Sequence, residues 1–255
     1  MSGKLTGRVA LITGAGSGMA KASAKLFASE GAKVVAADLN LEAVQATVAE
    51  IGADGGDATA VQVDVSDEVS VQAMVASAVS AYGRIDILFN VAGIPQFATP
   101  IEEVAVADFQ RILSVNVVGP WLCAKHAVPE LRKTGDGVIL NISSVASMRP
   151  RGGTCCYSCS KGAINTMSRA LAVEFAPEVR VNTIMPGPTD TPMMKGFIPG
   201  FDAEKYKGVE AGVPLGKFVQ PEDVAYTALF LCTNPKVTGA EIRVDSGLFV
   251  GRGDK

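Results

Sequence analysis

The 255-residue sequence predicts a single α/β domain in which helices cover both faces of a doubly wound, parallel sheet of about seven strands. Three observations predict this fold. Short runs rich in β-branched apolar residues alternate with longer, alanine-rich segments. Several of the short runs are apolar almost throughout, which is typical of strands buried on both faces. No linker, low-complexity tract or internal repeat divides the chain, so we expect one domain over residues 1–255.

The short apolar runs are the expected strands. Each is separated from the next by enough chain for a crossover helix, which predicts parallel pairing. In chain order they are Arg8–Thr13, Lys33–Asp38, Ala60–Val65, Ile85–Asn90, Gly137–Ser143, Val179–Met185 and Ala240–Asp245.

The longer segments between these runs are the expected helices. The first ends at Gly31, and glycine is common just past a helix C-terminus. In chain order the helices are Met19–Gly31, Leu41–Ile51, Val69–Tyr82, Val106–Lys133, Tyr157–Ala176 and Pro221–Cys232.

One segment, Gly187–Pro214, breaks this alternation. It holds many prolines and glycines and no strand signal, and it is too long for an ordinary connection. It also carries apolar side chains, among them Met193, Met194 and Phe197, which a disordered linker would not favour. We therefore expect a substrate-binding flap at about residues 188–214.

The composition is that of a soluble globular protein, with 48% hydrophobic and 19% charged residues. The net charge of -3 and the absence of a Lys/Arg block argue against nucleic-acid binding. No apolar run reaches the roughly 18 residues of a membrane span, and the first ten residues lack the apolar core of a signal peptide. Five cysteines without a regular framework fit a reducing compartment, so we expect a cytoplasmic protein.

The first expected strand runs directly into the glycine-containing stretch TGAGSGMA, residues Thr13–Ala20. Glycines between a strand and a helix let the backbone approach a phosphate, and the helix N-terminus offers free N–H groups. The spacing, with Gly14, Gly18 and Ala20, is G-x-x-x-G-x-A rather than G-x-G-x-x-G. The position of the loop in a βαβ unit favours a dinucleotide site; the alternative is a plain strand–helix turn.

The second expected strand ends at Asp38. A carboxylate there can accept hydrogen bonds from the diol of an adenine ribose and would repel a 2′-phosphate. Ser17 in the loop and Leu39 after the acid supply no positive charge to hold such a phosphate. The sequence therefore favours NAD over NADP as cofactor. The alternative is that Asp38 serves as a helix N-cap or turn residue, which is compatible with ribose binding.

Two further polar stretches follow strands that should end at the same edge of the sheet. They are Asp64-Val65 and the sequence NVAG at Asn90–Gly93. Ligands of doubly wound sheets bind at the carboxyl ends of the strands, so we expect both stretches to border the nucleotide crevice.

Tyr157 and Lys161 are four residues apart, so they share one face of a helix. A nearby ammonium is expected to lower the tyrosine pKa from its usual value of about 10 and to make the tyrosine a usable acid–base group. Ser144, thirteen residues before Tyr157, can hydrogen-bond a substrate oxygen, and Ser143 competes for this role. The alternatives are a solvated helix face for the Tyr–Lys pair and a polar turn at a strand end for the serines.

These motifs together resemble the short-chain dehydrogenase/reductase family over nearly the whole chain. The matching pieces are TGAGSGMA, Asp38, Asp64-Val65, NVAG, Asn116 in SVNVVG, Ser144 in NISSVAS, Tyr157–Lys161, PGPTDT at Pro186–Thr191 and VDSG at Val244–Gly247. The resemblance implies a Rossmann fold and an NAD-dependent enzyme that interconverts a secondary alcohol and a ketone. It also implies a homotetramer with Val106–Lys133 and Tyr157–Ala176 in its interfaces.

The resemblance assigns roles to individual residues. It implies that Ser144 rather than Ser143 binds the substrate oxygen, and that Asn116 holds a water in a proton relay with Lys161. Lys161 would also bind the nicotinamide ribose, and Thr191 with the backbone near Thr189 would bind the carboxamide. The full set expected at the cofactor is Gly14, Ser17, Gly18, Met19, Asp38, Leu39, Asp64, Val65, Asn90, Ala92, Gly93, Tyr157, Lys161, Pro186, Gly187, Thr189 and Thr191.

The sequence departs from the family pattern at three places. Ala20 and Ser246 stand where the family has glycine, and Val91 stands where it often has asparagine. None of the three removes a reacting group, so they bear on geometry rather than on activity.

The substrate pocket is expected beside Tyr157 with a mixed to apolar lining that suits a small cyclic alcohol, a hydroxyacyl group or a sugar. Its expected residues are Ile94, Gln96, Ser144, Met148, Met193 and Phe197, with Pro95 and the rest of Met193–Phe201 around them. Arg149 and Arg151 could recognise an anionic substrate, or they could pack in a loop or pair with acidic groups.

The cysteines Cys155, Cys156 and Cys159 surround Tyr157. A structural zinc needs four ligands, and the chain has one histidine, His126, and no second C-x-x-C, so no metal site is expected. A redox role is possible, but small residues on a packed helix are the simpler reading, and alkylation here should slow the enzyme. The RGD tripeptide near the C-terminus is an accidental match.

Two other function classes remain open. One is an NAD-binding module without catalysis, such as a redox-responsive regulator. The other keeps the fold but reduces an enoyl group or epimerises a sugar; the Tyr–Lys spacing and the chain length disfavour it.

Overall fold

The computed structural model describes residues 3–196 and 203–251, and its centre is a seven-stranded sheet in the order β3-β2-β1-β4-β5-β6-β7. All six neighbouring pairs are parallel. The strands are β1 Val9–Thr13, β2 Lys33–Asp38, β3 Asp57–Gln62, β4 Ile87–Asn90, β5 Gly137–Ile142, β6 Val179–Pro186 and β7 Glu241–Val244. This confirms the predicted fold. Since β2 and β4 flank β1 on opposite sides, the strand order reverses there, and this is where such sheets bind ligands.

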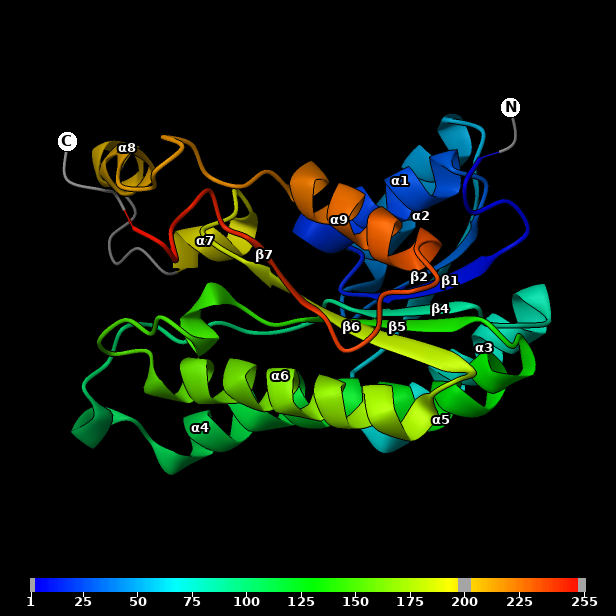
Figure 1. Ribbon diagram of the computed structural model, residues 1–255, viewed down its shortest axis with the longest axis horizontal. Coiled ribbons are helices and arrows are strands. Elements are labelled where there is room, and N and C mark those ends of the chain that lie inside the picture. Colours follow the sequence, from blue (N-terminus) through cyan, green and yellow to red (C-terminus); the bar gives the residue numbers. More distant parts are fainter. Residues whose placement is uncertain (1–2, 197–202, 252–255) are drawn as a thin grey trace.

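Helices cover both faces of the sheet. Figure 1 shows α1, α2 and α9 on one face and α3, α4, α5 and α6 on the other. Their bounds are α1 Gly18–Ser29, α2 Leu41–Ala53, α3 Glu68–Tyr82, α4 Val106–Leu113, α5 Gly119–Lys133, α6 Cys155–Phe175 and α9 Pro221–Thr233. Successive residues of β1 belong to different cores. Ile12 lies in the core that contains Phe27 of α1, and Leu11 lies in the core that contains Phe175 of α6. This is why the strands are apolar almost throughout.

The third strand lies three residues earlier in the chain than the sequence predicts. It spans Asp57–Gln62 rather than Ala60–Val65 because it pairs only with β2, and the last residue of β2, Asp38, lies opposite Gln62. Val63 still donates its N–H to the carbonyl of Asp38 (2.9 Å). Val63 and Val65 are buried in the core, so their apolar character reflects packing beyond the end of the ladder.

The segment predicted as one long helix, Val106–Lys133, is helical throughout but not uniform. A π-helical turn at Ser114–Val118 separates α4 from α5. At the start of α5 the chain runs close to the segment that follows β3. A Cβ on Gly119 would lie 2.9 Å from the Val65 side chain in that segment. The π turn carries Asn116, and such turns occur frequently at functional sites.

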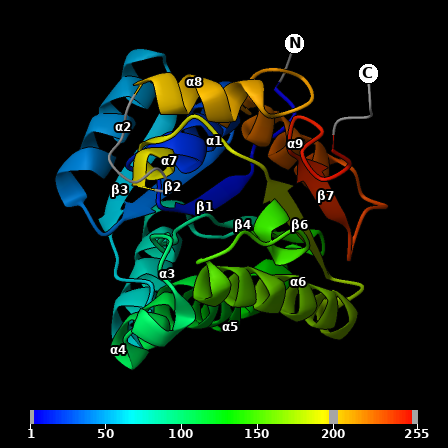
Figure 2. The ribbon, with the colours of Figure 1, turned by 90° about the vertical axis from the view of Figure 1, so that its left-hand side faces the viewer.

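The segment expected as a flap contains two short helices within the described residues, α7 Pro192–Gly196 and α8 Ala203–Ala211. Figure 2 views the molecule from the side on which both helices lie. Thr189 and Val219 form a β-bridge at the base of this segment. Phe197 falls outside the described residues. None of the helices in the described part of the chain is long and apolar enough to cross a membrane.

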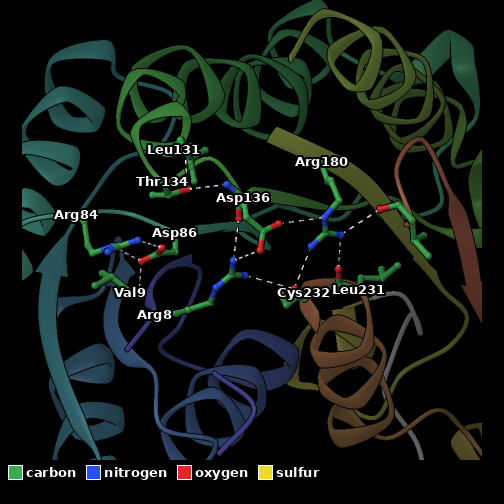
Figure 3. Close-up of polar contacts among 11 residues, drawn as sticks. Arg8, Val9, Arg84, Asp86, Leu131, Thr134, Asp136, Arg180, Leu231 and Cys232 are labelled. Atoms are coloured by element: carbon green, nitrogen blue, oxygen red, sulfur yellow. Dashed lines mark hydrogen bonds and ion pairs between the residues drawn. The ribbon is translucent and has the colours of Figure 1, made fainter. Parts of the chain in front are cut away.

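At the amino ends of the strands, charged side chains pair with one another (Figure 3). Arg8, just before β1, pairs with Asp136, just before β5, and Arg180 of β6 approaches the same carboxylate at 3.6 Å. Arg84 and Asp86 pair at 2.6 Å before β4. These contacts tie the strand starts together at the edge opposite to the ligand-binding edge.

Candidate active site

The glycine loop between β1 and α1 is held close to two other loops. Gly14 has a φ of +75°, and a Cβ there would lie 3.0 Å from the main chain of Ala92, after β4. Gly18 has a φ of +53°, and a Cβ there would lie 3.1 Å from Cγ2 of Thr191, after β6. Left-handed backbone and close approach both favour glycine. The loop therefore brings three strand ends together at one site.

Neighbouring residues fix the shape of this loop. The N–H of Ala15 donates to the carbonyl of Ala37 (3.0 Å), and Thr47 Oγ1 donates to the carbonyl of Ala15 (2.9 Å). Thr13 Oγ1 accepts the N–H groups of Val91 (3.2 Å) and Ala92 (3.3 Å). Thr13 thus positions the loop after β4, a role that the sequence motif did not reveal.

Asp38 lies against the glycine loop at the end of β2. Its Oδ2 accepts the N–H of Gly16 (2.9 Å), and its Oδ1 accepts the N–H of Asn40 (2.9 Å). The N-cap of α2 is Asn40, whose side chain accepts the N–H of Ala43 (3.1 Å), so Asp38 is not the cap. Each carboxylate oxygen keeps lone pairs for a further donor, as a ribose diol would need. Leu39 is 65% exposed beside it.

Asp64 and Asn90, which are also expected at the cofactor crevice, form hydrogen bonds within the protein. Asp64 Oδ1 accepts the N–H (2.9 Å) and the hydroxyl (2.6 Å) of Ser66, which shapes the turn before α3. Asn90 is buried and donates to Asn141 Oδ1 (2.9 Å), which in turn donates to Ser168 (2.9 Å). Asn90 therefore joins β4 to β5 and α6, and only its main chain is available to a cofactor.

Tyr157, Lys161 and Ser144 line one cavity of about 550 Å³. Lys161 Nζ lies 5.7 Å from the centre of the Tyr157 ring and donates to the carbonyl of Ile142 (3.0 Å). Ser143 Oγ donates to the main-chain carbonyl of Lys161 (2.8 Å). Of the two serines, Ser143 is thus committed to holding α6 against β5, while the Ser144 hydroxyl hydrogen-bonds the Tyr157 side chain.

Burial controls the protonation of this pair. Desolvation raises the pKa of Tyr157 to about 12, although its hydrogen bond with Ser144 opposes the rise. Desolvation lowers the pKa of Lys161 to about 8. The sequence-based expectation that Lys161 lowers the Tyr157 pKa is therefore wrong for this structure. Desolvation is the largest cause of the shift in the Tyr157 pKa, and the Lys161 ammonium is itself buried and donates to the Ile142 carbonyl.

Asn116 lies on the π turn beside this pair. Its Oδ1 accepts the N–H of Ile94 (2.8 Å), and its Nδ2 donates to the carbonyl of Ile94 (3.0 Å) and to Ser160 Oγ (3.2 Å). A Cβ on Gly93 would lie 3.1 Å from Asn116 Oδ1 and 3.6 Å from Lys161 Nζ. The side chain of Asn116 thus fixes the loop after β4, and Gly93 leaves room for this contact.

The structure brings only part of the expected substrate set to the cavity. Ile94 and Met193 line it. Gln96 does not, because it is buried with Oε1 accepting the N–H of Tyr157 (3.0 Å) at the start of α6. Met148 is 48% exposed and also does not line the cavity. Gln96 therefore positions the helix of Tyr157 instead of meeting a substrate.

The cavity is also lined by Met194 of the expected flap and by Arg149 and Arg151, the candidate anion-recognition residues. It has further walls that the sequence motifs did not indicate, among them Ala98, Thr154 and Leu248. Arg149 donates from Nη1 to the main-chain carbonyl of Leu248, which joins the loop before α6 to the C-terminal segment. Leu248 could not be found by pattern, because its contact with the site depends on this long-range pairing. Of the cofactor set, Met19, Gly93, Pro186, Gly187, Thr189 and Thr191 line the same cavity.

The cysteines near Tyr157 do not line the cavity. Cys155 and Cys159 are exposed, and Cys156 is buried. Over residues 3–196 and 203–251, no three side chains from His, Cys, Asp and Glu form a group that could hold a metal ion. The one histidine, His126 of α5, lies with its Nε2 2.9 Å from Oε1 of Glu68 in α3.

The sequence and the fold resemble those of known oxidoreductases. A family model described as "Enoyl-(Acyl carrier protein) reductase" matches residues 14–249. The chain is 42% identical to a 2,5-dichloro-2,5-cyclohexadiene-1,4-diol dehydrogenase of Sphingobium indicum, covering 98% of this chain and 100% of that protein. It is 37% identical to meso-2,3-butanediol dehydrogenase of Serratia marcescens, over 94% of each chain. The structure matches that of a 3-ketoacyl-(acyl-carrier-protein) reductase from Brucella melitensis complexed with NADH, with a TM-score of 0.89 and 37% identity over 96% of this chain and 99% of that chain.

Proposed function

Because this chain belongs to the short-chain dehydrogenase/reductase family of oxidoreductases, we propose that it is an NAD(H)-dependent enzyme that interconverts a secondary alcohol and a ketone. The observation that carries the proposal is the meeting of Tyr157, Lys161 and Ser144 in one cavity with residues of the nucleotide crevice. An acid–base group, a cation and a hydrogen-bond donor are then available where a hydride carrier would be bound.

The residues present fit a dinucleotide. Gly14 and Gly18 give the backbone the close approach that a pyrophosphate needs, and α1 begins directly behind them. Asp38 retains acceptor capacity for a ribose diol and favours NAD over its 2′-phosphorylated form. Gly187, Thr189 and Thr191 at the end of β6 would hold the nicotinamide, whose ring supplies or accepts the hydride when bound. The Brucella relative was solved with NADH, which supports the same choice.

The protonation of Tyr157 suits it to the ketone direction. With a pKa of about 12 it keeps its proton at neutral pH, so its hydroxyl can donate that proton to the substrate oxygen as the hydride reaches the carbonyl carbon. Ser144, which hydrogen-bonds Tyr157, donates to the same oxygen and holds it in place. In the alcohol direction Tyr157 has to release its proton before it can accept the one from the alcohol.

Lys161 and Asn116 complete a route for that proton. A lysine with a pKa of about 8 exchanges its proton near neutral pH far more readily than an exposed lysine. Both polar atoms of the Asn116 side chain already form hydrogen bonds with Ile94 and Ser160. A relay water would therefore be bound by the main chain of Asn116. Lys161 also would bind the nicotinamide ribose.

The relatives narrow the reaction. The named activities include dehydrogenation of a cyclic diol and of butanediol, and reduction of a ketoacyl group. Each involves a secondary alcohol or a ketone, which supports that substrate class here. The family model carries the name of an enoyl reductase, but Tyr157 and Lys161 are four residues apart, a spacing that favours alcohol chemistry. By family membership we also propose a homotetramer that uses α4, α5 and α6 in its interfaces.

The test is NADH formation from NAD over a broad panel of neutral and acidic secondary alcohols, with Tyr157→Phe measured beside the parent. Turnover in the parent that falls at least about 1,000-fold in the variant would support the proposal. NADH binding in both proteins without turnover of any alcohol would instead favour a non-catalytic NAD-binding module.

A further inference from the structure

The loop between β5 and α6 brings two arginines to the wall of the cavity. Arg149 and Arg151 both line it, together with Lys161, and no acidic side chain of the described residues does. A cavity with several cations and no compensating acid favours an anion over a neutral molecule. The cationic wall lies in the same cavity as Ser144 and Tyr157, so an anion held there can belong to the substrate itself.

Within the described residues, neither arginine has an acidic partner that would make it structural. In the part of the chain that the structure describes, no carboxylate forms an ion pair with Arg149 or Arg151. Arg149 uses one of its five donors on the Leu248 carbonyl. The arginines at the opposite edge of the sheet behave differently, because Arg8, Arg84 and Arg180 each pair with an aspartate.

The segment that carries the two arginines is held in place by its backbone. The N–H of Arg149 donates to the carbonyl of Val145 (2.8 Å). Thr154 donates to the carbonyl of Arg151 through its hydroxyl (2.8 Å), and the N–H of Thr99 donates to the carbonyl of Gly153 (3.0 Å). A Cβ on Gly153 would lie 2.9 Å from the nitrogen of Thr99. The arginines are therefore presented by a fixed loop, which reduces the entropy lost when they bind a ligand.

We propose that the substrate is an anionic hydroxy acid, whose carboxylate or sulfonate is bound by Arg151 and Arg149 while its secondary alcohol lies at Tyr157 and Ser144. The inference rests on the proposed dehydrogenase function and names the substrate class within it. A planar guanidinium binds either acid group through two hydrogen bonds, which fixes the orientation of the carbon chain as well as its charge. The same cations disfavour amino alcohols, because like charges would meet in the cavity.

The experiment compares matched alcohols that differ in charge. The pairs are cyclohexanol with hydroxycyclohexanecarboxylate, and sec-butanol with β-hydroxybutyrate, with hydroxypropanesulfonate added as a second acid group. We expect kcat/KM to be about 10–100-fold higher for the anion of a pair, and to fall with added salt. Arg151→Gln and Arg149→Gln should each lower the anion-to-neutral ratio about tenfold, through KM rather than kcat, and Arg151→Lys should restore part of it.

Lys236→Gln is the control for the loss of one cation, since Lys236 is exposed between α9 and β7 and does not line the cavity. It should leave the anion-to-neutral ratio of the parent unchanged. Equal kcat/KM for the two members of each pair would overturn the inference and leave the dehydrogenase proposal intact. So would a ratio that responds equally to Arg151→Gln and to Lys236→Gln.

A binding measurement covers the case in which no alcohol is oxidised. Calorimetry with cyclohexanecarboxylate and its neutral amide, on the protein with NADH, reports recognition of the anion without chemistry. Tighter binding of the acid that is lost in Arg151→Gln would support the anion site even if the dehydrogenase proposal had failed. Equal binding of acid and amide would overturn it.

Discussion

At the scale of single residues, the chemistry depends on two neighbouring side chains that are both shielded from water. Lys161 is buried and Tyr157 is half-buried, and desolvation raises the pKa of Tyr157 and lowers that of Lys161, in each case toward the neutral form. The charged form of Lys161 is therefore less favourable in the protein than it would be in water. Its presence is explained by the function of the site rather than by the stability of the fold.

Replacing Lys161 by methionine should therefore stabilise the protein at neutral pH. The pKa of Lys161 is lowered from 10.5 to about 8, and at about 1.4 kcal/mol per pKa unit the cost of the buried charge is on the order of 3 kcal/mol. Below pH 8 the parent bears this cost in full. Between pH 8 and 10.5 the unfolded chain binds the extra proton, so the stability of the parent rises with pH. Urea unfolding of Lys161→Met and parent at several pH values measures the difference.

The gap between the two proteins should be about 1–3 kcal/mol at pH 7, because methionine also leaves the Ile142 carbonyl without its donor, and it should narrow by pH 10. Lys217→Met is the control, since Lys217 is exposed and its charge carries no cost of burial that the substitution could relieve. A Lys161→Met protein that is less stable than the parent at pH 7 would contradict the argument.

A second prediction at this scale concerns cofactor choice. Asp38→Ala combined with Leu39→Arg should raise the preference for NADPH over NADH by about 10–100-fold. The change removes the carboxylate that repels a 2′-phosphate and adds a guanidinium that binds one. Leu39 is 65% exposed, so the long side chain fits there without repacking. Fluorescence titration gives the dissociation constants, and Leu39→Arg alone separates the added cation from the lost acid. An unchanged preference would mean that the ribose does not lie at Asp38.

At the scale of elements, the first turns of α6 carry the site and its exposed thiols together. Cys155 and Cys159 are exposed on either side of Tyr157, and Cys156 is buried. Although Cys159 is exposed, partial desolvation of its thiol and the hydrogen bond with Cys155 raise its pKa. A raised pKa leaves less thiolate at neutral pH, so thiol reagents should react slowly there and faster as pH rises.

Alkylation of Cys155 and Cys159 should lower turnover by about tenfold or more, because an adduct on this turn disturbs the bond from Tyr157 N–H to Gln96 that sets the start of α6. Mass spectrometry measures labelling, and the NADH assay measures activity on the same samples. The double variant Cys155→Ser, Cys159→Ser should resist inactivation. Full activity after complete labelling of both cysteines would show that this turn tolerates bulk.

The elements also show which features local sequence can predict. The strands and the positions of the loops between them followed from apolar runs and glycines, since both depend on near neighbours in the chain. The start of β3 did not, because it depends on where β2 ends, at Asp38 opposite Gln62. The π turn of Asn116 lies inside a pattern that looks uniformly helical. Gln96 was expected at the substrate, but its amide is bound to the backbone of α6.

At the scale of the whole molecule, the two edges of the sheet use charge differently. At the carboxyl edge, Arg149, Arg151 and Lys161 line the cavity, and no acidic side chain from residues 3–196 or 203–251 lines it with them. At the amino edge, arginines are matched by aspartates and main-chain carbonyls, and Figure 3 shows Arg180 between Asp136 and the residues Leu231 and Cys232. On our proposal the carboxyl edge serves a ligand, and the amino edge serves the fold. The sequence singles out Arg149 and Arg151 but does not show that they line the cavity. It does not show the pairs at the amino edge either, because those partners are far apart in the chain.

Arg180 should accordingly be one of the most sensitive positions for stability outside the site. It is only 8% exposed, and its guanidinium donates to Leu231 (2.8 Å) and Cys232 (3.0 Å) in the last turn of α9 and to Val237 (3.1 Å). Arg180→Met would remove the Arg180 donors from all three carbonyls and one cation from Asp136, at a cost of about 2–4 kcal/mol. Two of the carbonyls keep a second donor, because Arg8 also donates to Cys232 (3.4 Å) and Asn182 to Val237 (2.9 Å). For a chain of this size that corresponds to a loss of about 5–12 °C in Tm. Thermal unfolding measures it.

The control for the stability loss of Arg180→Met is Arg169→Met. Arg169 also pairs with an acid, Glu241, but it is 55% exposed, so its loss should cost less than about 1 kcal/mol. Arg180→Lys should retain part of the stability, because an ammonium can reach one of the carbonyls but not three. The KM for NAD should not change in Arg180→Met, since this edge lies away from the cofactor crevice. Equal Tm losses for the two methionine variants would mean that the amino-edge cluster is no stronger than a surface ion pair, and that the apolar cores alone hold the strand starts together.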